Sequence, residues 1–153
     1  MDATQARKYS TRRRAIVQAV SDALQQINGA APFRTSVQNI EPRLKFWDEV
    51  TDFPAIHIGA GAETREYEGG GFRFRYLRLT VRCYVQDNDD VIAALEELLE
   101  DVETVLEDND PLTYTDSTGA SQATVKTTIL TVDTDEGVLE PLGVGEITAE
   151  IQY

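Results

Sequence analysis

The strongest constraint on the fold is a ten-residue stretch, residues 77–86, in which apolar and polar side chains alternate. Leu77, Leu79, Val81, Cys83 and Val85 occupy one parity, and Arg78, Thr80, Arg82, Tyr84 and Gln86 occupy the other. Successive side chains of a strand point to opposite faces, so this pattern predicts a strand of an antiparallel sheet with one buried face. The aromatic residues of 72–76 have the opposite parity. This predicts either a bulge near Tyr76 or an aromatic row that covers something else, such as another subunit.

Two helices are predicted on either side of this strand. Residues 87–90, Asp-Asn-Asp-Asp, provide an N-cap for a helix that runs to about Asp108 with a leucine-rich stripe. An earlier apolar stripe predicts a helix over residues 4–28, which Gly29 ends. Three consecutive arginines, Arg12 to Arg14, would oppose the helix dipole in a first turn, so a cap near Thr4 is preferred to one at Ser10 or Thr11.

Shorter strands complete the predicted order of elements. They cover residues 32–40, 55–58, 123–132 and the C-terminal stretch through 147–153. Gly59 to Gly61 are expected to end the second of these, and residues 63–71 and 115–121 are expected to be loops. The order α-β-β-β-α-β-β predicts one α+β domain over residues 1–153. It would contain a mostly antiparallel sheet of four to five strands flanked by two helices, the first of them a basic N-terminal helix or arm.

Composition excludes several classes of function. The 153 residues include 27 acidic and 14 basic side chains, giving a net charge of −13, which argues against nonspecific binding to nucleic acid or anionic membranes. No segment approaches the ~20 apolar residues that span a bilayer. With one cysteine and one histidine, a disulfide framework and a Cys/His zinc site are excluded within one chain. His57 and Cys83 are expected to be structural, and neither a catalytic residue nor a cofactor is predicted.

The second helix carries the most concentrated charge. Between Asp89 and Asp108 there are nine carboxylates and no basic residue. One interpretation is a solvated face, and another is a surface that faces a basic partner or lines a channel that repels DNA. A glycoside-type carboxylate pair is a third interpretation, but no residue is singled out as the proton-holding acid. The candidates for an acidic lumen or partner face are Glu96, Glu97, Glu100, Asp101, Glu103 and Glu107.

Basic residues cluster in two places. Arg7, Arg12, Arg13 and Arg14 form a positive arm that is a candidate for binding a partner. On the long strand, Arg73 and Arg75 share one face and Arg78 and Arg82 share the other. One interpretation is ordinary exposed arginines, and another is that they meet acidic surfaces of neighbouring copies. The candidates for an interface with another subunit or another partner are Glu66, Glu68, Phe72, Arg73, Phe74, Arg75, Arg78 and Arg82.

The arrangement across most of the chain resembles the tail terminator, or tail-completion, proteins of tailed bacteriophages. The resemblance is carried by the arginine-rich first helix, Phe53-Pro54-Ala55-Ile56, the glycine-rich loop 66–71, Cys83-Tyr84-Val85, the aspartate-capped helix, residues 132–137 and Pro141-Leu142-Gly143.

That resemblance implies a structural virion protein with no catalytic residue. It implies a homo-oligomeric ring, usually hexameric, that caps the tail tube at full length, stops polymerisation and offers an attachment surface to the neck or connector. Viral DNA would pass through the lumen without sequence-specific binding. The protein would lie at the tail–neck junction after assembly in the host cytoplasm. The alternatives are a head–tail connector or tube-like subunit and, more distantly, a small acidic enzyme or binding domain.

Overall fold

The fold combines two helices with a five-stranded sheet and a separate two-stranded sheet. The computed structural model describes residues 10–153. Its elements are α1 (Arg12–Leu24), β1 (Asn39–Glu41), η1 (Trp47–Glu49), β2 (Ala55–Tyr67), η2 (Gly69–Gly71), β3 (Arg73–Gln86), α2 (Val91–Asp108), β4 (Thr113–Thr115), β5 (Ser121–Ala123), β6 (Lys126–Thr134) and β7 (Leu142–Gln152). The predicted α+β class is confirmed. Among the described residues, no helix has the length and apolarity that a membrane crossing requires.

The main sheet has the order β1-β2-β3-β7-β6. Three of its four neighbouring strand pairs, β2–β3, β3–β7 and β6–β7, are antiparallel. The short edge strand β1 pairs with β2 in parallel, so the sheet is mixed, and the prediction of a mostly antiparallel sheet is confirmed. Strands β4 and β5 form the second, two-stranded sheet.

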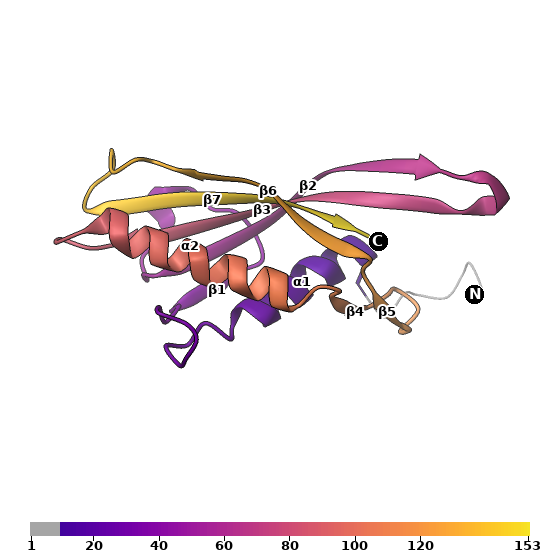
Figure 1. Cartoon of the computed structure of the whole chain (residues 1–153), viewed down its shortest axis with the longest axis horizontal. Coiled ribbons are helices and arrows are strands. Elements are labelled where there is room, and N and C mark those ends of the chain that lie inside the picture. Colours follow the sequence, from indigo (N-terminus) through magenta and orange to yellow (C-terminus); the bar gives the residue numbers. More distant parts are fainter. Residues whose placement is uncertain (1–9) are drawn as a thin grey trace.

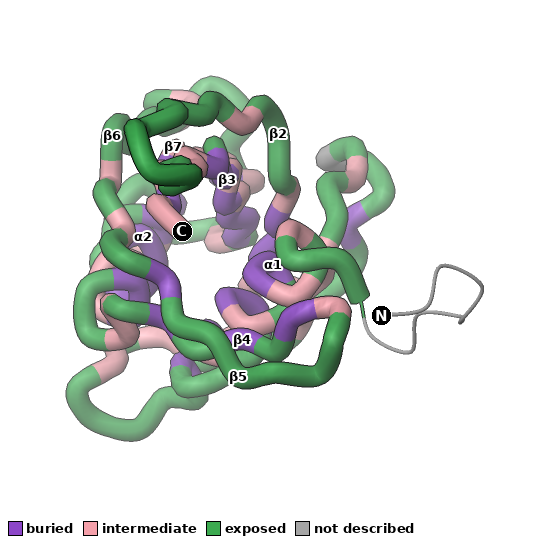
Figure 2. The backbone as a smooth tube through the Cα atoms, turned by 90° about the vertical axis from the view of Figure 1, so that its right-hand side faces the viewer, coloured by how far each residue is buried: buried purple, intermediate pink, exposed green. Residues whose placement is uncertain are grey.

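Both helices lie against the same face of the main sheet (Figure 1). The parity predicted for the long strand is confirmed, because Leu77, Leu79, Val81 and Cys83 of β3 are all fully buried. Ile147 and Ile151 of β7 are buried beside them, as the pattern of the last strand predicted. The buried segments therefore gather between the sheet and the helices (Figure 2), where they form one apolar core.

Helix α2 follows the predicted boundaries and lies very close to β7. Asp90 caps it by accepting a hydrogen bond from the backbone N–H of Ala93 at 3.1 Å. A Cβ atom placed on Gly143 would lie 2.9 Å from Val91, and one on Gly145 would lie 3.0 Å from Leu99. Glycine at these two positions allows the helix to approach the strand backbone.

Helix α1 begins later than the sequence predicts. Thr11 is its N-cap, and its hydroxyl accepts a hydrogen bond from the N–H of Arg14 at 3.3 Å, so the preference for an earlier cap is wrong. Two of the three arginines of the first turn have partners outside the helix. Arg13 donates to the carbonyl of Gly61 and Arg14 donates to that of Pro42. These long-range contacts hold basic side chains where the helix dipole alone disfavours them. The helix also ends earlier than predicted, at Leu24, although Gly29 does adopt a positive φ of +84°.

Strand β2 is much longer than predicted and continues through the glycines expected to end it. The register shifts between Ala60 and Glu63, so the bulge lies in β2 and not near Tyr76 in β3. The pairing of β3 with the C-terminal segment ends at Arg75, which exchanges two backbone hydrogen bonds with Tyr153, while β2 and β3 continue to pair as far as Tyr67 and Arg73. The hairpin therefore projects past the rest of the sheet (Figure 1). We call residues 66–74 the hairpin overhang.

Two other segments differ from the prediction. Residues 32–40, expected as a strand, contribute only an isolated bridge at Ser36 and the start of β1. The region expected as a polar loop and one strand, residues 115–132, instead contains a hairpin turn, β5 and most of β6. In the hairpin turn, Asp116 accepts hydrogen bonds from Thr118 at both the backbone N–H and the hydroxyl, and these bonds close the turn.

Candidate interaction surfaces

The hairpin overhang exposes large aromatic side chains. Phe72 is 72% exposed, Tyr67 70% and Phe74 38%. Glu66 lies directly opposite Phe74 and accepts a hydrogen bond from the hydroxyl of Tyr76 at 3.3 Å. Glu68 is exposed at the turn. The structure thus brings together four of the predicted interface residues, Glu66, Glu68, Phe72 and Phe74, on one projecting element.

Five arginines surround a single hollow at the base of the overhang. Arg12 and Arg13 come from the first turn of α1, Arg65 from β2, and Arg73 and Arg75 from β3. Thr11, Ser117 and Tyr153 complete the lining of the hollow, whose volume is about 370 Å³. We call this site the arginine hollow. It gathers five of the 14 basic residues of a strongly acidic chain.

A buried carboxylate lies beneath the arginines. The side chain of Glu63 is 4% exposed, pairs with Arg65 at 2.8 Å and accepts a hydrogen bond from the hydroxyl of Tyr153. Burial alone would raise the pKa of Glu63, but these two hydrogen bonds and the charges of Arg65 and Arg13 together outweigh burial and lower the pKa. Burial, together with the bond to Glu63, raises the pKa of Tyr153 to about 12. Glu63 is therefore a charged carboxylate committed to Arg65 and Tyr153.

The other arginines of the hollow have fewer partners. The guanidinium carbon of Arg75 lies 5.7 Å from the ring centroid of Tyr153, over its face. Its Nε is buried and has no hydrogen-bond partner among residues 10–153. Within the same part of the chain, Arg12 and Arg73 form no ion pair. Positive charge thus exceeds negative charge in the lining.

On α2, four of the predicted carboxylates form a row. Glu96, Glu100, Glu103 and Glu107 are spaced at i, i+4, i+7 and i+11, which places them along one side of the helix. We call them the acidic row. Burial, and then the charges of Glu107, Glu100 and Glu96, raise the pKa of Glu103. Within residues 10–153, Glu100 has one ion-pair partner, Arg34, at 3.6 Å in an exposed pair.

The remaining two predicted carboxylates of α2 lie elsewhere. Glu97 is exposed. Asp101 is only 4% exposed and accepts hydrogen bonds from the backbone N–H groups of Arg34 and Thr35 and from the Thr35 hydroxyl. The placement of Asp101 on an open acidic face is therefore wrong, because the loop at residues 34–35 covers it.

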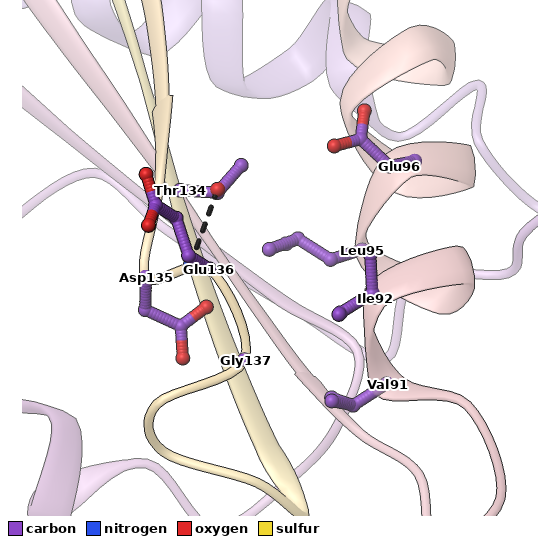
Figure 3. A pocket seen from close by; sticks show the side chains of 8 residues that line it. All are labelled: Val91, Ile92, Leu95, Glu96, Thr134, Asp135, Glu136 and Gly137. Atoms are coloured by element: carbon purple, nitrogen blue, oxygen red, sulfur yellow. Dashed lines mark hydrogen bonds between the residues drawn. The ribbon is translucent and has the colours of Figure 1, made fainter.

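A small groove lies where α2 begins, at the end of the molecule opposite the hairpin overhang (Figures 1 and 3). Ile92 and Leu95 of α2 face Asp135 and Glu136 of the β6–β7 turn, and Glu96 forms part of the rim (Figure 3). Ile92 is 55% exposed. Two apolar residues of the same turn, Val138 and Leu139, are 82% and 36% exposed. This end of the molecule combines apolar and acidic side chains.

The other predicted basic residues are distributed over separate surfaces. Arg82 pairs with Glu146 of β7 at 3.0 Å, and Arg78 lies opposite Glu150, both on the sheet face turned away from the core. Arg73 and Arg75 line the arginine hollow on the other face, as their parity predicted. Arg12 and Arg13 reach the hollow whereas Arg14 contacts Pro42. Arg7 lies outside the described residues.

His57 and Cys83 are both buried. Burial, reinforced by the charge of Lys45, lowers the pKa of His57, whose ring lies 5.0 Å from that of Tyr84. Burial raises the pKa of the Cys83 thiol to about 12. In residues 10–153, no three His, Cys, Asp or Glu side chains are arranged to hold a metal ion.

The arginine hollow is the feature that sequence reasoning missed. Arg65 lies in a segment expected to be a loop, and Arg12 and Arg13 belong to a helix 40 or more residues away in the chain. In the sequence, the shared parity of Arg73 and Arg75 indicates that these two arginines lie on one face of the strand. It does not indicate which other arginines join them.

An overhanging aromatic hairpin, a basic hollow and a separate acidic row are typical of the class of structural proteins that act by assembling with others. Comparison with known proteins agrees. A family model described as Bacteriophage Tail Tube Terminator Protein matches residues 10–153. The tail tube terminator protein p142 of Escherichia phage T5 is 31% identical over 150 residues, which cover 92% of each chain. The chain therefore belongs to the bacteriophage tail tube terminator protein family, whose members are structural proteins and not enzymes.

A solved structure shares the fold. A chain of the virion of a native gene transfer agent particle superposes with a TM-score of 0.55, covering 90% of this chain and 93% of that one. The two sequences are 10% identical, so the likeness concerns the fold alone.

Proposed function

We propose that this protein forms a ring, hexameric in the simplest case, that caps the tail tube when the tail reaches full length. The ring stops further polymerisation and offers a surface to a neck or head-completion protein. Family membership supports the role of terminator. The observation that supports a ring is the hairpin overhang, whose exposed Phe72 and Tyr67 have no cover within residues 10–153.

A ring needs two different, complementary patches on each copy. The hairpin overhang supplies aromatic and basic side chains at one end of the molecule, and the groove at the start of α2 supplies apolar and acidic side chains at the other. In this proposal the hairpin overhang of each copy contacts the groove of the next copy, and the same contact repeats around the ring. Exposed aromatic anchors are common at the energetic centres of protein interfaces.

DNA passes through the lumen of this ring without sequence-specific binding. The net charge of −13 supports this part of the proposal, because stable binding to DNA comes mainly from contacts between basic side chains and phosphates. In this proposal the acidic row contacts a basic partner. The sheet face that carries Arg78 and Arg82 remains a second candidate contact, towards the tube or the neck.

The experiment is electron microscopy of tails assembled with and without this protein. We expect tubes of uniform length that end in a ring of this chain at the neck side, and tubes of uncontrolled length when it is missing. Density for the chain along the whole tube would instead identify a tube subunit, and density on the head side of the neck would identify a connector. Either result would refute the proposed role.

A further inference from the structure

The arginine hollow brings together three arrangements that each destabilise the folded chain. Arg65 and Arg75 are directly opposite each other on β2 and β3, and like charges in such cross-strand pairs are destabilising. Arg12 and Arg13 stand in the first turn of α1, where the helix dipole disfavours positive charge. The Nε of Arg75 is buried without a hydrogen-bond partner among the described residues, which carries a desolvation cost.

An anionic ligand would relieve the first two of these costs. An anionic group in the hollow would neutralise the opposed guanidinium groups and accept their hydrogen bonds. The first-turn N–H groups of a helix also favour negative charge nearby. Glu63 cannot play this part, because it is already bonded to Arg65 and Tyr153 beneath the arginines. The chemistry of the hollow therefore calls for carboxylates from outside the folded chain.

The acidic row lacks positive charge, just as the arginine hollow lacks negative charge. Its four carboxylates stand three or four residues apart on one side of the helix, where like charges repel one another. Arg34 is their one ion-pair partner within residues 10–153. From Glu96 to Glu107 the row is about 16 Å long, at 1.5 Å per helical residue. The arginine hollow and the acidic row are thus complementary in charge.

We propose that the arginine hollow of one copy binds the acidic row of the neighbouring copy. This inference rests on the proposed function, in which copies stand side by side in a ring. The hollow and the row belong to different elements of the same chain, so each copy gives one surface and receives the other. Charge pairing of this kind selects the correct partner and fixes the register of the contact.

Charge exchange tests the proposal. The hollow variant carries Arg12→Glu and Arg73→Glu, and the row variant carries Glu103→Lys and Glu107→Lys. Both should fold well, because Arg12→Glu and Glu107→Lys each improve the interaction with a helix dipole. The quadruple variant carries all four changes and restores opposite charges across the contact. A control, Arg43→Glu with Lys126→Glu, alters the net charge by the same amount as the hollow variant on surfaces outside both sites.

Two readouts are required. Sedimentation velocity at low salt measures self-association, and the amount of each variant in tails purified from infected cells measures incorporation. We expect the hollow variant and the row variant each to lose at least about tenfold in self-association or incorporation, with the control unchanged. The quadruple variant should return to within about threefold of the original protein. An equal mixture of hollow and row variants should also assemble, in alternation.

Three results would overturn the inference. The first is a hollow variant that assembles as the original protein does. The second is loss in both variants without recovery in the quadruple variant, which would assign the hollow to another virion component. The third is binding of a 30-base-pair DNA duplex by the original protein that disappears in the hollow variant. Absence of the original protein from tails would refute the proposed function. Even then, recovery of self-association by the quadruple variant in sedimentation velocity would support the contact between copies.

Discussion

The carboxylate of Asp101 accepts a hydrogen bond from the hydroxyl of Thr35 at 2.6 Å, joining the middle of α2 to the loop that follows α1. The same carboxylate accepts bonds from the backbone N–H groups of Arg34 and Thr35. Three donors therefore converge on one carboxylate that is 4% exposed. The residue is a structural tie between two distant parts of the chain.

Replacing Asp101 by Ala should lower the free energy of unfolding by about 2–4 kcal/mol, because two backbone N–H groups and a hydroxyl lose their acceptor. Urea unfolding followed by circular dichroism measures this change. Glu97→Ala on the same helix is the control and should remain within about 0.5 kcal/mol of the original protein. Equal stability of the two variants would show that the Asp101 tie contributes nothing.

Replacing Gly145 by Val should destabilise the fold by about 1–3 kcal/mol through overpacking. A Cβ at this position already lies 3.0 Å from Leu99 and 3.1 Å from Leu95 of α2, so the helix must move away from β7. Gly69→Ala, in open space at the hairpin turn, is the control. Thermal unfolding distinguishes them, and an unchanged melting temperature for Gly145→Val would contradict the close packing described here.

Burial of His57 makes the stability of the protein depend on pH. Its pKa is lower in the folded chain than the ordinary value of 6.5, so the unfolded chain binds a proton more readily. The stability is therefore complete above about pH 6.5 and is lost as the pH falls towards the folded pKa, at up to about 1.4 kcal/mol per pH unit. His57→Phe keeps a ring against Tyr84 and removes the titration. Melting temperatures from pH 7.5 to 5 should fall more steeply for the original protein, and parallel curves would disprove this linkage.

Replacing both Phe72 and Phe74 by Ser should leave the melting temperature nearly unchanged but impair assembly. Both side chains are exposed, so their removal costs the free chain little. In a ring they would be buried, and loss of aromatic anchors typically weakens an interface by 100-fold or more, that is, by about 3 kcal/mol. Counting tails that lack a terminal ring measures the effect. Leu130→Ser on the outer strand β6 is a matched exposed control.

Much of the fold follows from local periodicity. The alternation of residues 77–85, the leucine stripe of α2 and the pattern of 147–151 predicted their buried faces, because each arises within one element. Glycines 59–61 predicted a strand end wrongly. Pairing with the long β3 outweighs the weak strand preference of glycine, and the chain absorbs the irregularity as a bulge.

The candidate sites depend on relations that periodicity does not contain. Helical spacing placed Asp101 with its exposed neighbours, but a loop 66 residues away covers it. The arginine hollow requires the register that sets Arg65 against Arg75, and also the docking of the α1 terminus beside them. Such long-range arrangements come from tertiary packing. The acidic row needed helical spacing alone, so the sequence was sufficient to predict it.

The hairpin overhang also divides the sheet into two parts that differ in local stability against opening. Between Leu77 and Val85, β3 has a strand on each side and a helix beneath it, whereas between Glu66 and Phe74 only β2 and β3 remain paired. A ribbon of two strands is barely stable in water. Amide hydrogens of residues 66–74 will exchange with deuterium well before those of the rest of β3, and a neighbouring copy bound to the ribbon would slow that exchange.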